Sequence, residues 1–85
     1  MASYKLEFAN SVRKDFKNIQ KKDAERILAR IDSLTEDPRP AGCVKLTGEE
    51  IYRIRVGSYR VLYKIEDAIL LIVIIKIGHR RDVYS

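Results

Sequence analysis

The chain is a basic protein of 85 residues, with 46% hydrophobic and 34% charged residues, a net charge of +5 and a pI near 9.5. This length allows one domain, 1–85, with a small core, and the composition is typical of a folded chain rather than a disordered one. The longest apolar run, 69–75, is much shorter than the roughly 20 residues of a membrane-spanning helix. The positive charge favours a polyanionic partner.

The single cysteine, Cys43, excludes an internal disulfide and leaves no second thiol for a metal cluster. We expect it to fill a small buried or half-buried space. A lone thiol suits a reducing cytosol, and residues 1–5 lack the basic-then-apolar pattern of a secretory signal. The sequence therefore predicts a soluble cytoplasmic protein, with no membrane partner and no cofactor.

The first half of the chain predicts one strand and two helices. Residues 4–8 alternate between apolar and polar, as in a half-buried strand, and Asn10 is placed to cap the helix that follows. A second helix begins at a cap on Asp23 and stops before Pro38, because the residue before proline disfavours helix. Spacings of three and four define the apolar stripes of these helices, formed by Ala9, Val12, Phe16 and Ile19 and by Ala24, Ile27, Leu28, Ile31 and Leu34. The basic residues between these stripes are explained as a solvated helix surface.

The second half predicts three strands joined by hairpins. A loop over 41–47 and a turn or bulge at 48–50 lead into a strand over 51–56. Gly57-Ser58 then separates two alternating runs, and glycine at the first loop position accepts the positive φ of a type II′ turn. Asp67-Ala68 turns the chain again before an apolar strand over 69–77 that is central in the sheet. This order indicates an α+β fold with the helices on one face of a mainly antiparallel sheet.

The hairpin loop fixes which residues face each other across the two strands. Val56 pairs with Tyr59, so Arg55 pairs with Arg60, and side chains alternate between the two faces. One face carries Arg53, Arg55, Arg60 and Lys64, and the other carries Tyr52, Ile54, Val56, Tyr59, Val61 and Tyr63. Two arginines about 5 Å apart repel each other unless an anion lies between them. The alternative is that these arginines pair with acids such as Glu49, Glu50 or Glu66.

The C-terminal residues add groups to this predicted site. Gly78 ends the last strand and Arg80 follows it, while Arg81 points elsewhere if the segment stays extended. Tyr84 is placed to stack on an unpaired RNA base, which aromatic rings beside cations commonly hold, although a terminal tyrosine alone is an ordinary surface residue. His79 is the only histidine and the one side chain here with an unperturbed pKa near neutrality. Cations and an aromatic ring together predict an RNA site.

The acidic residues of the second half sit at turns instead of converging on one point, as a two-metal nuclease would require. No glycine-rich phosphate loop, metal-ligand cluster or Ser/His/Asp set is present. If the chain is a nuclease, we expect it to work without metal.

Five short motifs, in this order, resemble the RelE toxins of the RelE/ParE superfamily. They are Asp37-Pro38, Lys45-Leu46-x-Gly48, Tyr52-Arg53-Ile54-Arg55, Ser58-Tyr59-Arg60 and the tail from Gly78 to Tyr84. The resemblance implies the toxin of a type II toxin–antitoxin system, held inactive by a cognate RelB-like antitoxin. It also implies an mRNA interferase, an endoribonuclease that enters the A site of the 30S subunit and inhibits translation. There the 2′-hydroxyl of the mRNA attacks the adjacent phosphate.

The resemblance also assigns roles position by position. Arg53 and Arg55 correspond to two basic strand residues, Arg60 to an arginine that stabilises the transition state, Arg80 to a proposed general acid, and Tyr84 to a tyrosine that stacks on a codon base. The best-known RelE has lysine at the two strand positions. Arginine is a poor proton acceptor because its pKa is above 12. The general base is therefore open, and His79 is a candidate proton carrier.

Three further cations, Lys45, Lys64 and Arg81, are expected to bind RNA. Two alternative functions stay open at this point. The same superfamily contains ParE-like inhibitors of DNA gyrase, which share the fold but lack the catalytic cations. The chain can also be a catalytically decayed protein that binds RNA or an antitoxin without cutting.

Overall fold

The computed structural model describes residues 3–46, 48 and 50–79. Its elements are β1 (Lys5–Phe8), α1 (Asn10–Lys17), α2 (Lys21–Ser33), β2 (Val44–Lys45), β3 (Ile51–Val56), β4 (Tyr59–Glu66), the 3₁₀ turn η1 (Asp67–Ile69) and β5 (Leu71–His79). The predicted order and the α+β class are confirmed. The structure adds β2, a two-residue strand in a segment predicted to be a loop.

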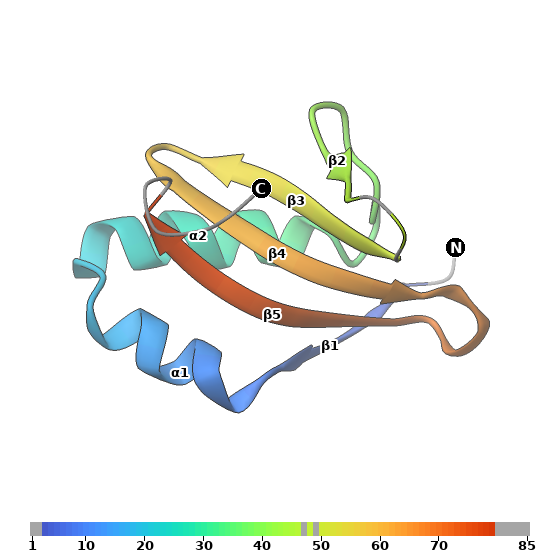
Figure 1. Cartoon of the computed structure of the whole chain (residues 1–85), viewed down its shortest axis with the longest axis horizontal. Helices are drawn as coiled ribbons and strands as arrows, with labels where there is room; N and C mark the ends of the chain where they lie inside the picture. The colour runs from blue at the N-terminus through green and yellow to red at the C-terminus, as the bar shows by residue number, and fades with distance from the viewer. Residues whose placement is uncertain (1–2, 47, 49, 80–85) are drawn as a thin grey trace.

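The strands form one five-stranded sheet in the order β1-β5-β4-β3-β2, in which β1 runs parallel to β5 and all other neighbours are antiparallel. Figure 1 shows α2 crossing behind the sheet and α1 lying beside β5, where β1 has ended. The strand β5 lies between β1 and β4, as its apolar sequence predicts. The helices thus leave the other face of the sheet uncovered among the described elements.

The core lies between the sheet and the helices. Three helical side chains, Val12, Ile27 and Ile31, are fully buried, as is Leu34 directly after α2, and they meet the inward residues of β3, β4 and β5. Phe16, Ile19 and Cys43 are partly buried against this core, as predicted. Leu28 departs from the predicted stripe, since it is 44% exposed.

The helix starts differ from those predicted. Asn10 is the first residue of α1 and the cap position belongs to Ala9, whose backbone is extended and whose N–H donates to the Ile74 carbonyl at 2.9 Å. The second helix starts two residues before Asp23, with Gln20 as its cap residue. Asp23 instead lies in the first turn, where a negative charge interacts favourably with the helix dipole.

The β3–β4 hairpin has the predicted register at every position, from Tyr52 opposite Tyr63 to Val56 opposite Tyr59. Gly57 has a φ of +60°, and Ser58 is not in the positive-φ region, as a type II′ turn requires. The next turn differs from prediction, because Ile69 belongs to η1 and Leu70 adopts the left-handed conformation, so β5 begins only at Leu71.

A β-bulge interrupts β5. Leu62 of β4 lies opposite Lys76, but the next residue, Tyr63, lies opposite Ile74, so Ile75 has no partner of its own. An extra residue of this kind changes the phase of the side chains that follow it. The buried residues of β5 are accordingly Ile72, Ile74 and then Ile77, while Lys76 is exposed.

Neither helix among the described residues has the length and apolar character that crossing a membrane would require.

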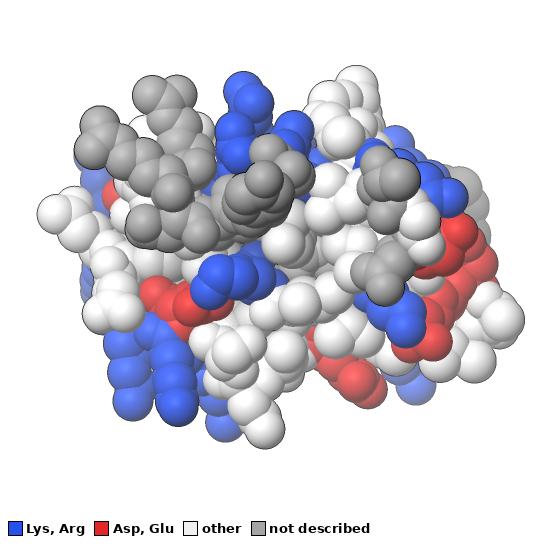
Figure 2. All heavy atoms as spheres, in the orientation of Figure 1, with Lys and Arg blue, Asp and Glu red and all other residues white. Residues whose placement is uncertain are grey.

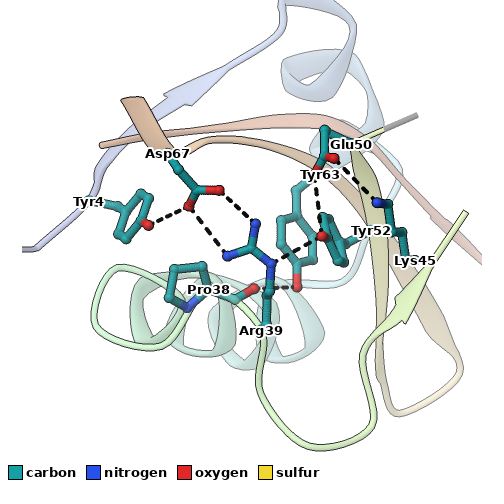
Figure 3. A network of polar contacts seen from close by, with 8 residues as sticks. All are labelled: Tyr4, Pro38, Arg39, Lys45, Glu50, Tyr52, Tyr63 and Asp67. Carbon is teal, nitrogen blue, oxygen red and sulfur yellow. Dashed lines mark hydrogen bonds and ion pairs between the residues drawn. The ribbon is translucent and has the colours of Figure 1, made fainter. Parts of the chain in front are cut away.

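A network of polar side chains ties together segments that are distant in the sequence (Figure 3). The Arg39 guanidinium donates to both carboxylate oxygens of Asp67, at 2.8 and 3.3 Å, and to the Tyr52 hydroxyl at 3.0 Å. The Tyr4 hydroxyl donates to Asp67 at 2.6 Å, and the buried Tyr63 donates to the Pro38 carbonyl at 2.8 Å. We call Tyr4, Arg39, Tyr52 and Asp67 the clasp, because they join the residue before β1, the loop after α2, β3 and the turn before β5.

The clasp predicts how stability depends on pH. The hydrogen bond from Arg39 is the main reason that the pKa of Asp67 lies below its usual value. Because the pKa is lower in the folded than in the unfolded state, the carboxylate stabilises the fold above the ordinary aspartate pKa of about 3.9, and this stabilisation is lost as the pH falls through the folded-state value.

We therefore expect Asp67→Asn to lower the melting temperature by a few degrees at neutral pH, a modest effect because the pair is exposed. The difference from the wild type should shrink in acid. Asp32→Asn is the control, an exposed acid on α2 whose side chain makes no ion pair among the described residues. Thermal melts between pH 2 and 7 measure both. A difference independent of pH would contradict the ionic role of Asp67.

Candidate nucleic-acid interface

The candidate site is a row of residues across the uncovered face of the sheet. Arg55 of β3 lies opposite Arg60 of β4, and Arg60 lies opposite Gly78 of β5. Val56 and Tyr59 close the two-residue turn, so Arg55 and Arg60 form the next pair, which is a non-hydrogen-bonded one. In such pairs the two Cα atoms are only about 4.5 Å apart. The sequence has therefore placed two guanidinium groups on adjacent strands, beside a residue without a side chain.

A second row lies one step along the same face. Val44, Arg53, Leu62 and Lys76 are neighbours across β2, β3, β4 and β5. Lys76 is a residue that the sequence reading missed, because strict alternation from Ile72 and Ile74 puts it in the core and only the bulge turns it outward. Lys64 shares the face but lies four residues from Arg60 along β4. Figure 2 shows Lys and Arg side chains over this part of the sheet and a separate group around α1.

The charges of this surface are only partly compensated. Among the described residues, Arg53 and Arg55 make no ion pair, whereas Lys76 has a long one, 3.7 Å from Nζ to Asp15 Oδ1. The alternative partner Glu50 is engaged by Lys45 at 3.2 Å. Like charges at the directly paired positions 55 and 60 repel each other. A polyanion bound across Arg55 and Arg60 would relieve that repulsion.

Lys45 does not belong to this group. It lies opposite Tyr52, on the face that packs on the helices, and its ammonium donates to Glu50. Glu50 also accepts from the Tyr52 hydroxyl at 3.4 Å, so Lys45 is connected to the clasp (Figure 3). An open hollow of about 460 Å³ lies between Lys45 and Lys64, and Gly48, Glu50 and Ile51 complete its lining.

His79 also lies on the helix-packed face. It is opposite Tyr59, and the two rings meet edge to face with centroids 5.8 Å apart. The bulge explains this position, since without the extra residue His79 would face the same side as Arg55 and Arg60. Arg80, Arg81 and Tyr84 lie outside the described residues.

For the RNA cleavage that the resemblance implies, we expect His79→Phe to stay within about threefold of the wild type, because phenylalanine keeps the ring contact with Tyr59 and removes only the titratable nitrogens. Rates measured from pH 5.5 to 8 should also keep the shape of the wild-type profile. A loss of tenfold or more, or the disappearance of one limb of the profile, would restore His79 as the proton carrier.

No three His, Cys, Asp or Glu side chains of the described residues are grouped so that they could hold a metal ion. The chemistry that the described groups offer is therefore that of fixed cations, which bind and orient phosphate and offset negative charge that develops on it.

Comparison with known proteins identifies the chain. A family described as the ParE toxin of the type II toxin–antitoxin system parDE matches residues 6–84. The chain belongs to this toxin family. The toxin is 30% identical over 89 residues to Toxin RelG of Mycobacterium tuberculosis, with 95% of both chains covered. It is 29% identical over 86 residues to Putative toxin RelE1 of Methanocaldococcus jannaschii, with 96% of both covered.

Solved structures give the same assignment. The toxin matches a chain of the archaeal RelE–RelB complex from Pyrococcus horikoshii with a TM-score of 0.83 and 30% identity, covering 95% of the toxin and 99% of that chain. It matches the intact RelBE toxin–antitoxin complex of E. coli with a TM-score of 0.76 and 26% identity, covering 92% and 96%. The predicted resemblance to RelE-type toxins is thus confirmed.

Proposed function

We propose that the toxin is a ribosome-dependent mRNA interferase that cuts messages in the A site. The observation that carries this proposal is the juxtaposition of Arg55 and Arg60 on the uncovered face of the sheet. Two cations side by side do not stabilise the fold, whereas an RNA phosphate bound between them would be attracted by both. The names of the RelE-type relatives support the same class of toxin.

In the proposed reaction, the 2′-hydroxyl of one nucleotide attacks the adjacent phosphorus and loses its proton. The bond from phosphorus to the 5′-oxygen of the next nucleotide breaks, and that oxygen takes up a proton. The products are a 2′,3′-cyclic phosphate and a 5′-hydroxyl. Negative charge grows on the non-bridging phosphate oxygens in between, and Arg53, Arg55 and Arg60 would offset it without accepting a proton.

Arg80 is proposed to protonate the leaving oxygen and Tyr84 to stack on a base, both by resemblance. Lys64, Lys76 and Arg81 would contact the RNA backbone farther along. We omit Lys45 and His79, because both lie on the other face. Alignment of the 2′-hydroxyl by the ribosome would lower the barrier by several kcal/mol and reduce the demand on a general base.

A RelB-like antitoxin is the proposed partner, since the structures similar to the toxin include RelE–RelB complexes. Acidic residues on such an antitoxin would match the basic face electrostatically. The prediction is tested by co-purifying the toxin with the product of a neighbouring small gene and titrating the complex with salt.

The proposed activity is tested by primer extension on a translated message in a reconstituted system, with and without ribosomes. Cuts that fall within A-site codons and require ribosomes would support the proposal. An intact message at full dose would reject it.

DNA gyrase inhibition is the second candidate, because the matching family is named for ParE. A supercoiling assay with purified gyrase separates the two. Inhibition of supercoiling without any cut in the message would favour this alternative.

A further inference from the structure

The outer edge of β5 changes partner halfway along the strand. Residues up to Ile74 pair with β1, which ends at Phe8, and Ala9 then donates its N–H to the Ile74 carbonyl. Beyond this point, no strand of the described residues lies beside β5 on that side. An unpaired edge next to a bulge is a place where strand register is weakly determined.

Side chains of α1 replace the missing strand. The backbone N–H of Ile77 donates to Asp15 Oδ2 at 3.0 Å, and the Ser11 hydroxyl makes a longer bond, 3.4 Å, to the Ile75 carbonyl. Ser11 and Asp15 are four residues apart, so they lie on one face of the helix. They contact the residues on both sides of Lys76, and Asp15 Oδ1 also lies 3.7 Å from the Lys76 ammonium.

We propose that Asp15 is a positioning residue of the toxin. Its carboxylate holds the bulge at Ile75 in place and so determines which side chains of β5 lie on the same face as Arg55 and Arg60. The expected effect of Asp15 on cleavage rests on the proposed function, whereas its expected effect on the strand does not.

The bulge decides the composition of the surface. With the extra residue at Ile75, Lys76 and Gly78 lie beside Leu62 and Arg60, and His79 faces away. A slip of one residue would bring Ile77 and His79 to that face and turn Lys76 toward the core. The position opposite Arg60, where Gly78 has no side chain, would then carry one.

The surroundings of Asp15 are suited to this role. Its side chain is 17% exposed, and a hollow of about 160 Å³ beside it is lined by Asn18, Ile19, Lys76, Ile77 and Gly78. A hydrogen bond to a partly buried carboxylate is stronger than one between neutral groups. Ile77, whose amide binds Asp15, lies three residues before Arg80 in the sequence.

The test compares Asp15→Ala, Asp15→Asn and the control Asp32→Ala, which removes an exposed acid on the other helix. Amide exchange followed by NMR reports on the strand. We expect Asp15→Ala to abolish the protection of the Ile77 amide while Ile72, in the part of β5 paired with β1, stays protected. Asparagine keeps an oxygen that accepts this bond and should restore protection.

Cleavage on ribosomes, measured below the melting temperature of every variant, reports on the site. We expect Asp15→Ala to lower kcat by about 10- to 100-fold with KM nearly unchanged, and Asp15→Asn to stay within about threefold of the wild type. The proposal is overturned if Ile77 stays protected in Asp15→Ala, if that variant cuts as the wild type does, or if asparagine fails to rescue. If the wild type does not cut, the proposed function fails, while exchange at Ile77 still decides whether Asp15 holds the bulge.

Discussion

Arg60→Ala is expected to reduce the proposed ribosome-dependent cleavage by about 100- to 1,000-fold, the range found when one preorganised charge-stabilising group is removed from an active site. Arg60 lies on the middle strand of the row, with Arg55 on one side and Gly78 on the other, and it is half-buried. Its backbone is fixed by hydrogen-bonded strands on both sides. A half-buried guanidinium on a fixed backbone needs little reorganisation when charge develops on the phosphate.

Two matched variants make this measurement decisive. Lys5→Ala removes an exposed cation from β1, at the far edge of the sheet, and should cut as the wild type does. Arg60→Lys keeps the charge but loses the planar fork, so an intermediate rate is expected. Circular dichroism confirms that each variant is folded. If folded Arg60→Ala cuts within threefold of the wild type, the row is not the catalytic site.

Ile74→Ala is expected to lower the free energy of unfolding by about 2–5 kcal/mol. Ile74 is completely buried, opposite Tyr63 on one side and Phe8 on the other, so the deleted atoms leave a cavity in the centre of the core. In a domain of this size, each kcal/mol shifts the melting temperature by roughly 4–8 °C. Chain stability is only about 5–15 kcal/mol in general, so the variant should be partly unfolded at growth temperature.

Ile69→Ala is the control, because it is the same substitution at a residue that is 63% exposed in the turn η1. Its effect should be within about 0.5 kcal/mol. Urea denaturation followed by circular dichroism measures both variants. Equal losses of stability would mean that the core does not lie where the structure places it.

The hairpin and the helices could be predicted because their signals are local. Gly57-Ser58 fixes a two-residue turn, and from that turn the pairing of Arg55 with Arg60 and the two faces of β3 and β4 follow by alternation. The buried stripe of α2 follows in the same way from residues three and four apart. Each of these inferences needs only neighbours in the sequence.

The predictions from the sequence fail where contacts between distant segments determine the structure. Alternation along β5 fails at Ile75, because α1 supplies the hydrogen-bond partners that a bulge needs, and this reverses the faces of Lys76 and His79. Arg39 follows Pro38, which predicts the helix stop, yet it contacts Asp67 and Tyr52, which lie far away in the sequence. No spacing rule within one element predicts such contacts.

Strand β4 separates the Arg55–Arg60 pair from Asp67 of the clasp. The turn at Gly57, next to the two arginines, precedes the strand, and Asp67 follows it (Figure 1). Eight residues of extended chain span about 26 Å. Substitutions of Arg55 and Arg60 can therefore change the proposed RNA site with little effect on the Arg39–Asp67 pair, while substitutions of that pair change folding with little effect on the two arginines. A toxin built in this way can evolve new specificity without first acquiring compensating stabilising mutations.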